Sequence, residues 1–236
     1  MKFAAEIGLN HDGSFDLACE LVRQARTAGA DFAKFQLGWR DAPGEINHFD
    51  RDRWIALKQW CEHVGIEMLA SIIVEEALDL ADALGLTTYK IASRTVVDAP
   101  ALCRRILARG RPTYVSLGMW EEREFPFGPP DGSGLRYVYC RSKYPTRPSD
   151  LASMPATFSD DGFCGYSDHS LGIDTCLTAI ARGATYIEKH LTLNKTSQVI
   201  RDHVLSATPE EFRQMVDLGR PMAQFVTASR TPGSLG

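Results

Sequence analysis

Two histidines follow strand-like segments in the second half of the sequence. His169 ends the run at residues 165–169, and His190 ends the run at residues 187–190. The ends of neighbouring strands converge on one face of a parallel barrel, so these two neutral imidazoles could share one divalent metal ion. A lone histidine at a strand end is more often a hydrogen-bonded structural residue. The metal hypothesis therefore requires a complete strand, helix, strand unit between the two.

Two lysines lie inside otherwise apolar segments. Lys34 stands in Phe-Ala-Lys-Phe, and Lys90 stands in Tyr-Lys-Ile-Ala. A buried ammonium group is costly unless an anion neutralises it, so an anionic substrate with a phosphate, a carboxylate or both is the simplest explanation. Two alternatives stay open. Each lysine could pair with a buried glutamate such as Glu6 or Glu188, and a strand-end lysine could form a Schiff base with a carbonyl substrate.

Eight apolar runs bounded by turn residues predict the strands that position these side chains. They cover residues 3–8, 32–37, 67–72, 88–92, 113–117, 135–140, 164–166 and 186–191. Most are followed by helical periodicity, and a glycine just before the next strand stops several of the helices: Gly29, Gly65, Gly85, Gly110 and Gly183. Alternating strands and helices imply a parallel sheet, and eight such units predict an α/β protein with a closed (β/α)8 TIM barrel.

Two connections are too short or too irregular for full helices. Residues 118–134 are rich in proline and glycine, which predicts a compact barrel with a reduced or missing fifth helix, and residues 38–50 predict a loop. The last helix is expected to follow the capping residue Thr208 and to bury Phe212, Met215 and Val216. The barrel domain is therefore expected to span residues 1–226, with residues 227–236 as a flexible tail.

The composition excludes several classes of function. The chain has 236 residues, 44% of them hydrophobic, and a formal net charge of −4, so it can bury a sizeable core and presents no basic field for nucleic acid. No apolar run approaches the roughly 20 residues that span a bilayer, and no cleavable signal is visible, so a cytoplasmic protein without a membrane partner is expected. Six scattered cysteines without a Cys-x-x-Cys pair predict reduced thiols.

Five motifs together resemble those of the N-acetylneuraminate (sialic acid) synthase family. They lie at residues 5–13, 29–36, 90–93, 165–169 and 187–190, in the family's order and spacing, and the resemblance runs from about residue 3 to residue 220. It implies a β/α barrel in which phosphoenolpyruvate condenses with the aldehyde of an N-acetylmannosamine-like sugar. The implied products are a nonulosonic-acid-type 2-keto-3-deoxy acid and phosphate, and the implied cofactor is Mn²⁺, with Mg²⁺ or Co²⁺ as alternatives.

The same resemblance implies roles for three groups of residues. His169 and His190 would be metal ligands, and Glu6 would act with them in catalysis, by steering a water molecule or balancing a cationic centre. The phosphate and carboxylate of phosphoenolpyruvate would be held by Lys34, Ser71, Lys90, Ser93, Ser116 and Ser142, the last standing where the family usually has a phosphate-contacting asparagine. The acceptor sugar would be faced by Gln36, Tyr144 and Asp202.

The sequence differs from the family pattern on the acceptor side. Arg94 and Thr95 stand where the family has Gly and Glu, and the family's usual antifreeze-like C-terminal domain, which covers the partner's active site, is not in this sequence. A different aldehyde acceptor is therefore expected, together with a homodimer or a companion chain that replaces the missing lid. Two rival hypotheses are a Schiff-base aldolase or lyase that uses Lys90, and a non-catalytic barrel subunit that needs a partner chain.

Overall fold

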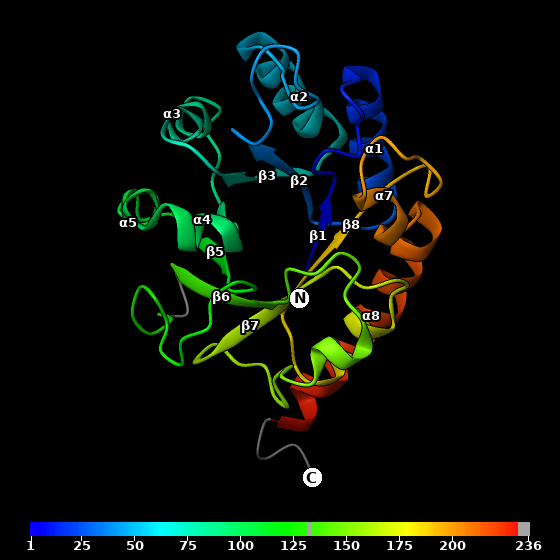
Figure 1. Cartoon of the computed structure of the whole chain (residues 1–236). Helices are drawn as coiled ribbons and strands as arrows, with labels where there is room; N and C mark the ends of the chain where they lie inside the picture. The colour runs from blue at the N-terminus through cyan, green and yellow to red at the C-terminus, as the bar shows by residue number, and fades with distance from the viewer. Residues whose placement is uncertain (132–133, 231–236) are drawn as a thin grey trace.

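Eight parallel strands close into a barrel in the computed structural model, which describes residues 1–131 and 134–230 (Figure 1). The strands follow one another around the barrel in chain order: β1 (Lys2–Glu6), β2 (Phe32–Leu37), β3 (Glu67–Ile72), β4 (Tyr89–Ile91), β5 (Thr113–Ser116), β6 (Leu135–Cys140), β7 (Phe163–Asp168) and β8 (Tyr186–His190). β1 pairs with both β2 and β8, which closes the hydrogen-bonded ladder. The predicted TIM barrel is confirmed, and every predicted strand lies within two residues of its observed ends.

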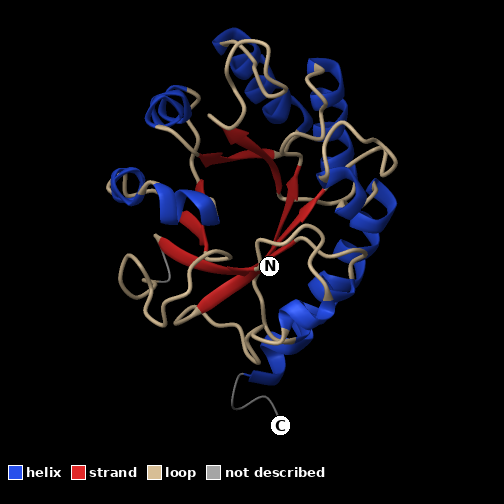
Figure 2. Cartoon of the chain, viewed as in Figure 1, coloured by secondary structure: helices blue, strands red, loops and turns tan. Residues whose placement is uncertain are grey.

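Helices form an incomplete ring outside the barrel (Figure 2). They are α1 (Phe15–Thr27), α2 (Arg51–Val64), α3 (Glu75–Ala83), α4 (Ser93–Asp98), α5 (Pro100–Leu107), α6 (Asp174–Ala181), α7 (Asp202–Leu205) and α8 (Pro209–Arg230). No helix joins β5 to β6 in the part of that connection that the structure describes, which confirms the missing fifth helix. After β6 there is only the 3₁₀ turn η1 (Pro148–Leu151), a reduction that the sequence pattern did not predict. Pro145 and Pro148 interrupt this connection and lack the N–H that a helix interior needs.

The inside of the barrel has an apolar floor and a polar upper layer. The floor is a separate buried cluster that consists of Ala4, Phe32, Leu69, Tyr114, Val138, Cys164 and Tyr186. Side chains alternate along a strand, so residues two positions further on also point inward. At those positions five strands carry polar side chains near their carboxyl ends: Glu6, Lys34, Ser71, Ser116 and Glu188. The strand pattern itself therefore places the polar groups at one end of the barrel.

The last helix, α8, begins with the predicted cap. The Thr208 hydroxyl accepts a hydrogen bond from the Glu211 N–H at 3.3 Å, and the Glu211 carboxylate accepts one from the Thr208 N–H at 2.9 Å. Phe212, Met215 and Val216 are buried, as predicted. α8 continues to Arg230, so helical structure extends beyond the expected boundary at residue 226, and residues 231–236 lie outside the described part of the chain.

Two further expectations concern the thiols and the membrane. All six cysteines are free thiols, five of them buried and Cys19 half-buried. Across the described residues, no helix combines the length and apolar character that a membrane span requires.

Candidate active site

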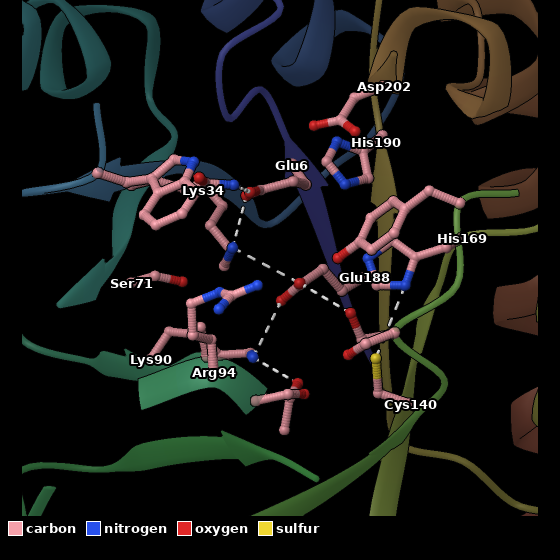
Figure 3. A pocket seen from close by; sticks show the side chains of 18 of the residues that line it. Glu6, Lys34, Ser71, Lys90, Arg94, Cys140, His169, Glu188, His190 and Asp202 are labelled. Atoms are coloured by element: carbon pink, nitrogen blue, oxygen red, sulfur yellow. Dashed lines mark hydrogen bonds and ion pairs between the residues drawn. The ribbon is translucent and has the colours of Figure 1, made fainter. Parts of the chain in front are cut away.

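A cavity of about 330 Å³ opens at the carboxyl ends of the strands (Figure 3). All the site residues proposed from the sequence line it: Glu6, Lys34, Gln36, Ser71, Lys90, Ser93, Ser116, Ser142, Tyr144, His169, His190 and Asp202. In TIM barrels this end carries the active site, because loops and strand ends from all eight units meet there. The fold thus brings together residues that are spread over almost 200 positions of the chain.

Two lysines and two glutamates form a continuous row of charges on the cavity floor. Lys34 Nζ lies 2.6 Å from Glu6 Oε2 and 3.5 Å from Glu188 Oε1, and Lys90 Nζ lies 3.9 Å from Glu188 Oε2. All four side chains are almost fully buried, with at most 7% of any of them exposed. The glutamate pairing left open by the sequence is therefore present, and both candidate partners take part in it.

The row of charges shifts the pKa values of its members in different directions. Burial lowers the pKa of Lys90, because the single carboxylate of Glu188 at 3.9 Å compensates only part of the desolvation and Lys34 adds repulsion. Burial alone would lower the pKa of Lys34, but the carboxylates of Glu188 and Glu6 outweigh this effect and raise the pKa. Burial alone would raise the pKa of Glu188, but Lys34 and Lys90 together hold this pKa well below its usual range. Lys34 and Glu188 thus favour each other's charged form, whereas the charge on Lys90 is compensated only in part.

Hydroxyl groups surround this row on neighbouring strands. Lys90 Nζ donates to Ser116 Oγ at 2.5 Å, and Ser167 Oγ donates to Glu188 Oε1 at 2.9 Å. Ser71 is in register with Lys90 across β3 and β4, and Ser93 Oγ accepts a hydrogen bond from the Gly118 N–H at 2.8 Å. Ammonium groups and hydroxyls together form a donor set suited to phosphate or carboxylate oxygens.

The two histidines lie side by side at the ends of β7 and β8. Their ring centroids are 5.5 Å apart. His169 Nδ1 lies 3.0 Å from the Arg141 carbonyl oxygen, which only accepts hydrogen bonds, so Nδ1 carries the proton and Nε2 keeps its lone pair. Burial and the neighbouring His190 lower the pKa of His169 to about 4, so its ring is neutral near pH 7. A neutral imidazole with a free lone pair on Nε2 is the form of histidine that coordinates a metal ion.

His190 also has an uncommitted nitrogen. Its Nδ1 is buried and has no hydrogen-bond partner within residues 1–131 and 134–230. Two adjacent imidazoles with free nitrogen atoms fit a divalent ion. Among the described residues, however, no group of three His, Cys, Asp or Glu side chains gathers at metal-binding distance, so this chain offers two ligands of its own.

The other side of the cavity is formed by Gln36, Tyr144 and Asp202. Gln36 Nε2 donates to Glu6 Oε1 at 2.6 Å, and the Tyr144 ring lies 4.4 Å from the His169 ring, centroid to centroid. Asp202 Oδ1 is buried and accepts no hydrogen bond from the described part of the chain. Figure 3 shows Asp202 and His190 on the same side of the cavity. These polar groups can receive the hydroxyls of a sugar-sized ligand.

Several lining residues were not assigned to the site from the sequence. Cys140, one of the six cysteines predicted to be reduced thiols, lines the cavity with its Sγ 3.7 Å from His169 Nδ1. Trp39, Met119 and Arg201 also line the cavity. Trp39 and Met119 lie in loops that no strand or helix pattern marks, and the only sequence signal for Arg201 is its position beside Asp202.

A buried ion pair on the outer face of the barrel supports the two histidines. Lys189 Nζ lies 2.5 Å from Asp168 Oδ2, and neither side chain is exposed. The Tyr166 hydroxyl donates to Asp168 Oδ1 at 2.6 Å. Because Asp168 precedes His169 and Lys189 precedes His190, this pair ties together the two strand ends that present the histidines.

Comparison with known proteins supports one family. The NeuB family model matches residues 45–230. The N-acetylneuraminate-9-phosphate synthase of Homo sapiens is 30% identical over 90% of this chain and 67% of that protein, and the N,N'-diacetyllegionaminic acid synthase of Legionella pneumophila is 30% identical over 90% of this chain and 69% of that protein.

A solved structure agrees with these matches in fold as well as in sequence. The N-acetylneuraminic acid (sialic acid) synthetase of Leptospira borgpetersenii superposes with a TM-score of 0.82 at 27% sequence identity, over 98% of this chain and 87% of that chain. The resemblance to sialic acid synthases is confirmed. Since the family model covers well over half of the sequence, the chain belongs to the NeuB family.

Proposed function

We propose that this protein is a metal-dependent synthase that condenses phosphoenolpyruvate with the aldehyde of an N-acetylmannosamine-like sugar. The products would be phosphate and a nonulosonic-acid-type 2-keto-3-deoxy acid. One observation carries the proposal: two buried lysines share Glu188 beneath a set of hydroxyls and beside two adjacent histidines. Membership of the NeuB family and the similarity to sialic acid and legionaminic acid synthases support the same reaction.

The donor would bind on the row of charges. Phosphoenolpyruvate carries a phosphate and a carboxylate, and Lys34 and Lys90 would neutralise these anions. Glu6 and Glu188 would then share the two lysines with the donor. Ser71, Ser93, Ser116 and Ser142 would donate hydrogen bonds to the oxygens of these anions. Burial strengthens each of these interactions, because little water competes for the charged groups.

His169 and His190 would hold the divalent ion, with Mn²⁺ proposed and Mg²⁺ or Co²⁺ as alternatives. Such an ion, when bound, polarises a carbonyl oxygen. Gln36, Tyr144 and Asp202 would orient the acceptor so that its aldehyde carbon faces the donor. The two histidines fit this task because each has a nitrogen free of other hydrogen bonds.

The proposed reaction forms one carbon–carbon bond and breaks one carbon–oxygen bond. The methylene carbon of phosphoenolpyruvate would attack the aldehyde carbon, and the aldehyde oxygen would gain a proton. Water would add to the second carbon of the donor and lose a proton, and cleavage of the carbon–oxygen bond would release phosphate. Glu6 would orient this water and accept its proton, since Lys34 and Gln36 hold both oxygens of the carboxylate in place.

A phosphate-release assay tests the proposal. The protein is incubated with phosphoenolpyruvate, Mn²⁺ and a panel of aldoses that includes N-acetylmannosamine. Phosphate is expected only when donor, metal and an aldose are all present, and removal of the metal with a chelator should abolish release until Mn²⁺ is added back. Lys34→Met should remove activity, and Arg23→Gln, on the outer surface of α1, should not. The proposal would be contradicted if no aldose on the panel led to phosphate release.

A Schiff-base aldolase or lyase is a second candidate function, favoured by the lowered pKa of Lys90. In that reaction the neutral amine of Lys90 would condense with the carbonyl of a keto acid such as pyruvate and release water. Borohydride reduction in the presence of pyruvate would then add a stable mass to Lys90, detectable by mass spectrometry. An unmodified Lys90 would leave the synthase as the better account.

Three expectations about the surroundings of the enzyme stay predictions. They are a cytoplasmic location, a homodimer, and a companion chain over the cavity as the alternative to that dimer. Light scattering of the purified chain distinguishes a monomer from a dimer.

A further inference from the structure

Residues 10–12, with the sequence Asn-His-Asp, belong to the first of the five motifs but have no part in the reaction proposed above. They lie in the turn between β1 and α1, and Asn10 and His11 are 1% and 0% exposed. Of the residues that the structure describes, those that line the cavity do not include these three. Buried polar side chains are costly unless other groups satisfy them, so their partners indicate what this segment does.

His11 is connected to the end of β2 through Asn47. Burial lowers the pKa of His11, so its ring is neutral near pH 7. The Gly13 N–H donates to His11 Nδ1 at 3.2 Å, so Nε2 carries the proton and donates to Asn47 Oδ1 at 3.0 Å. The Asn47 amide in turn donates to the carbonyl oxygens of Gln36 at 2.5 Å and Trp39 at 2.9 Å. These hydrogen bonds fix the backbone of two residues that line the cavity.

Asp12 is connected to α7 through His203, which is 1% exposed. His203 Nε2 donates to Asp12 Oδ1 at 2.9 Å, and His203 Nδ1 lies 2.8 Å from the Thr192 hydroxyl oxygen. The φ angle of Asp12 is +51°, a left-handed conformation that residues other than glycine adopt only where their surroundings hold it. Because His203 directly follows Asp202, this contact holds the start of α7 in place.

Asn10 holds the same region at two further points. Asn10 Nδ2 donates to the Leu191 carbonyl oxygen at 2.8 Å and to Ser206 Oγ at 2.9 Å. Ser206 Oγ then donates to the Asp202 carbonyl oxygen at 2.6 Å. The backbone of Asp202 is therefore tied to the β1–α1 turn from both sides, while its side chain lines the cavity.

We propose that Asn10, His11 and Asp12 are positioning residues that set the distance between two walls of the acceptor side. Gln36 and Trp39 form one wall, and Asp202 forms the other. Three consecutive side chains are hydrogen-bonded toward both walls, so neither wall can shift without breaking these bonds. The inference rests on the proposed function, because it takes this side of the cavity as the acceptor site.

The donor should depend much less on this segment. Lys90 is held by Ser116 at 2.5 Å and by Glu188 at 3.9 Å, on strands at a distance from the β1–α1 turn. Loss of the positioning contacts is therefore expected to weaken binding of the aldose and to leave binding of phosphoenolpyruvate nearly unchanged.

Two pairs of variants separate the positioning contacts from the size of the side chain. His11→Asn keeps an acceptor near the place of Nδ1 but removes the donor to Asn47, whereas His11→Gln keeps a donor near the place of Nε2. Asp12→Gly removes the carboxylate and adopts a φ of +51° without strain. Asp12→Asn keeps an oxygen acceptor for His203 and tolerates the same backbone conformation.

Steady-state phosphate release tests the inference with phosphoenolpyruvate, Mn²⁺ and the panel aldose that reacts fastest. The KM for this aldose should rise about tenfold in His11→Asn and in Asp12→Gly, and it should stay within about twofold of the wild-type value in the two conservative variants. The KM for phosphoenolpyruvate should change by less than about twofold in all four. Equal increases in both KM values would overturn the inference, because the segment would then support the whole site.

Hydrogen exchange measured by mass spectrometry locates the effect without relying on catalysis. His11→Asn should accelerate amide exchange about tenfold in residues 36–49, and Asp12→Gly should do so in residues 191–206. The conservative variants should exchange like the wild type. Faster exchange throughout the barrel would overturn the inference, because it would indicate a general loss of stability.

The two measurements separate this inference from the proposed function. A wild-type protein that releases no phosphate with any aldose would contradict the synthase, and exchange changes confined to the two walls would still support the positioning role. An unchanged aldose KM in His11→Asn and Asp12→Gly would contradict the inference and leave the synthase reaction standing.

Discussion

At the scale of single residues, Glu188 has the largest number of charged and polar partners in the site. Its carboxylate lies 3.5 Å from Lys34 and 3.9 Å from Lys90, and it accepts hydrogen bonds from Ser167 at 2.9 Å and from Tyr186 at 2.6 Å. Lys90 thus depends on Glu188 for its nearest counter-charge, whereas Lys34 also pairs with Glu6. An anionic ligand would take over part of this role.

Replacement of this carboxylate by an amide should therefore destabilise the ligand-free protein. Glu188→Gln leaves Lys90 without its nearest counter-charge, and loss of one partner of a buried ion pair costs about 3 kcal/mol or more. Phosphoenolpyruvate should raise the melting temperature of Glu188→Gln by more than that of the wild type, because its anions replace the lost charge. Scanning calorimetry with and without the ligand measures both effects. Equal melting temperatures in the absence of ligand would contradict this account.

Glu6 offers a second test at the same scale. Glu6→Gln keeps the size of the side chain but removes the base proposed to accept a proton from water, so kcat should fall by about 100-fold. The KM for phosphoenolpyruvate should change much less, because the donor lysines remain. Steady-state phosphate release gives both constants, and Glu20→Gln on α1 is the control. Near-normal turnover in Glu6→Gln would argue against its role.

At the scale of elements, the ends of β7 and β8 are joined on both faces of the barrel wall. Inside, Ser167 donates to Glu188, and outside, Asp168 pairs with Lys189. For Asp168, burial acts to raise the pKa, but Lys189 outweighs it and holds the pKa below its ordinary value. Because the carboxyl is harder to protonate in the folded state, the pair stabilises the protein above pH 3.8 and loses that effect as the pH falls below it.

Asp168→Asn should therefore be strongly destabilising, because it leaves Lys189 buried without a counter-charge. We expect a loss of about 3 to 5 kcal/mol in the free energy of unfolding, measured by urea denaturation at pH 7. The double variant with Lys189→Met should be more stable than Asp168→Asn alone, since no charge is then left unpaired. Glu20→Gln, which breaks an exposed pair with Arg23, should have a far smaller effect. A double variant less stable than Asp168→Asn would contradict this explanation.

At the scale of the whole molecule, closure of the barrel requires one very close approach between strands. A Cβ atom on Gly165 would lie 2.2 Å from the Tyr186 backbone oxygen and 2.7 Å from the Tyr186 Cβ. Gly165 is paired with Tyr186 in the β7–β8 register. Any side chain at this position would force the two strands that carry His169 and His190 apart.

Gly165→Ala should thus cost about 3 kcal/mol in the free energy of unfolding, at the upper end of the usual range for overpacking. Gly85→Ala is the matched control: its φ is +65°, and a Cβ there would meet no atom within 4 Å, so only backbone strain of about 1 kcal/mol is expected. Urea denaturation of the three proteins gives the comparison. Equal losses in the two variants would show that the close contact with Tyr186 has no special effect.

The fold was accessible from the sequence because its signals are local. Strand ends, helix caps and the missing fifth helix follow from apolar runs, from Thr208 and Glu211, and from prolines within short segments. β7 was predicted too short, at residues 164–166, because Ser167 and Asp168 are polar. Their burial depends on Glu188 and Lys189 of the neighbouring strand, and that pairing is not a local property.

The sequence likewise predicted the residues of the candidate site but not the contacts between them. Residue types and motif order were enough to select the lysines, serines and histidines at strand ends, because a barrel brings all strand ends to one face. Only the tertiary structure decided that Glu6 and Glu188 balance the lysines and that His169 and His190 keep free nitrogen atoms. It also brought Arg94 onto Trp39 and Arg201 onto Tyr144. Contacts of this kind depend on distances between segments far apart in the chain, and no local pattern of residues encodes them.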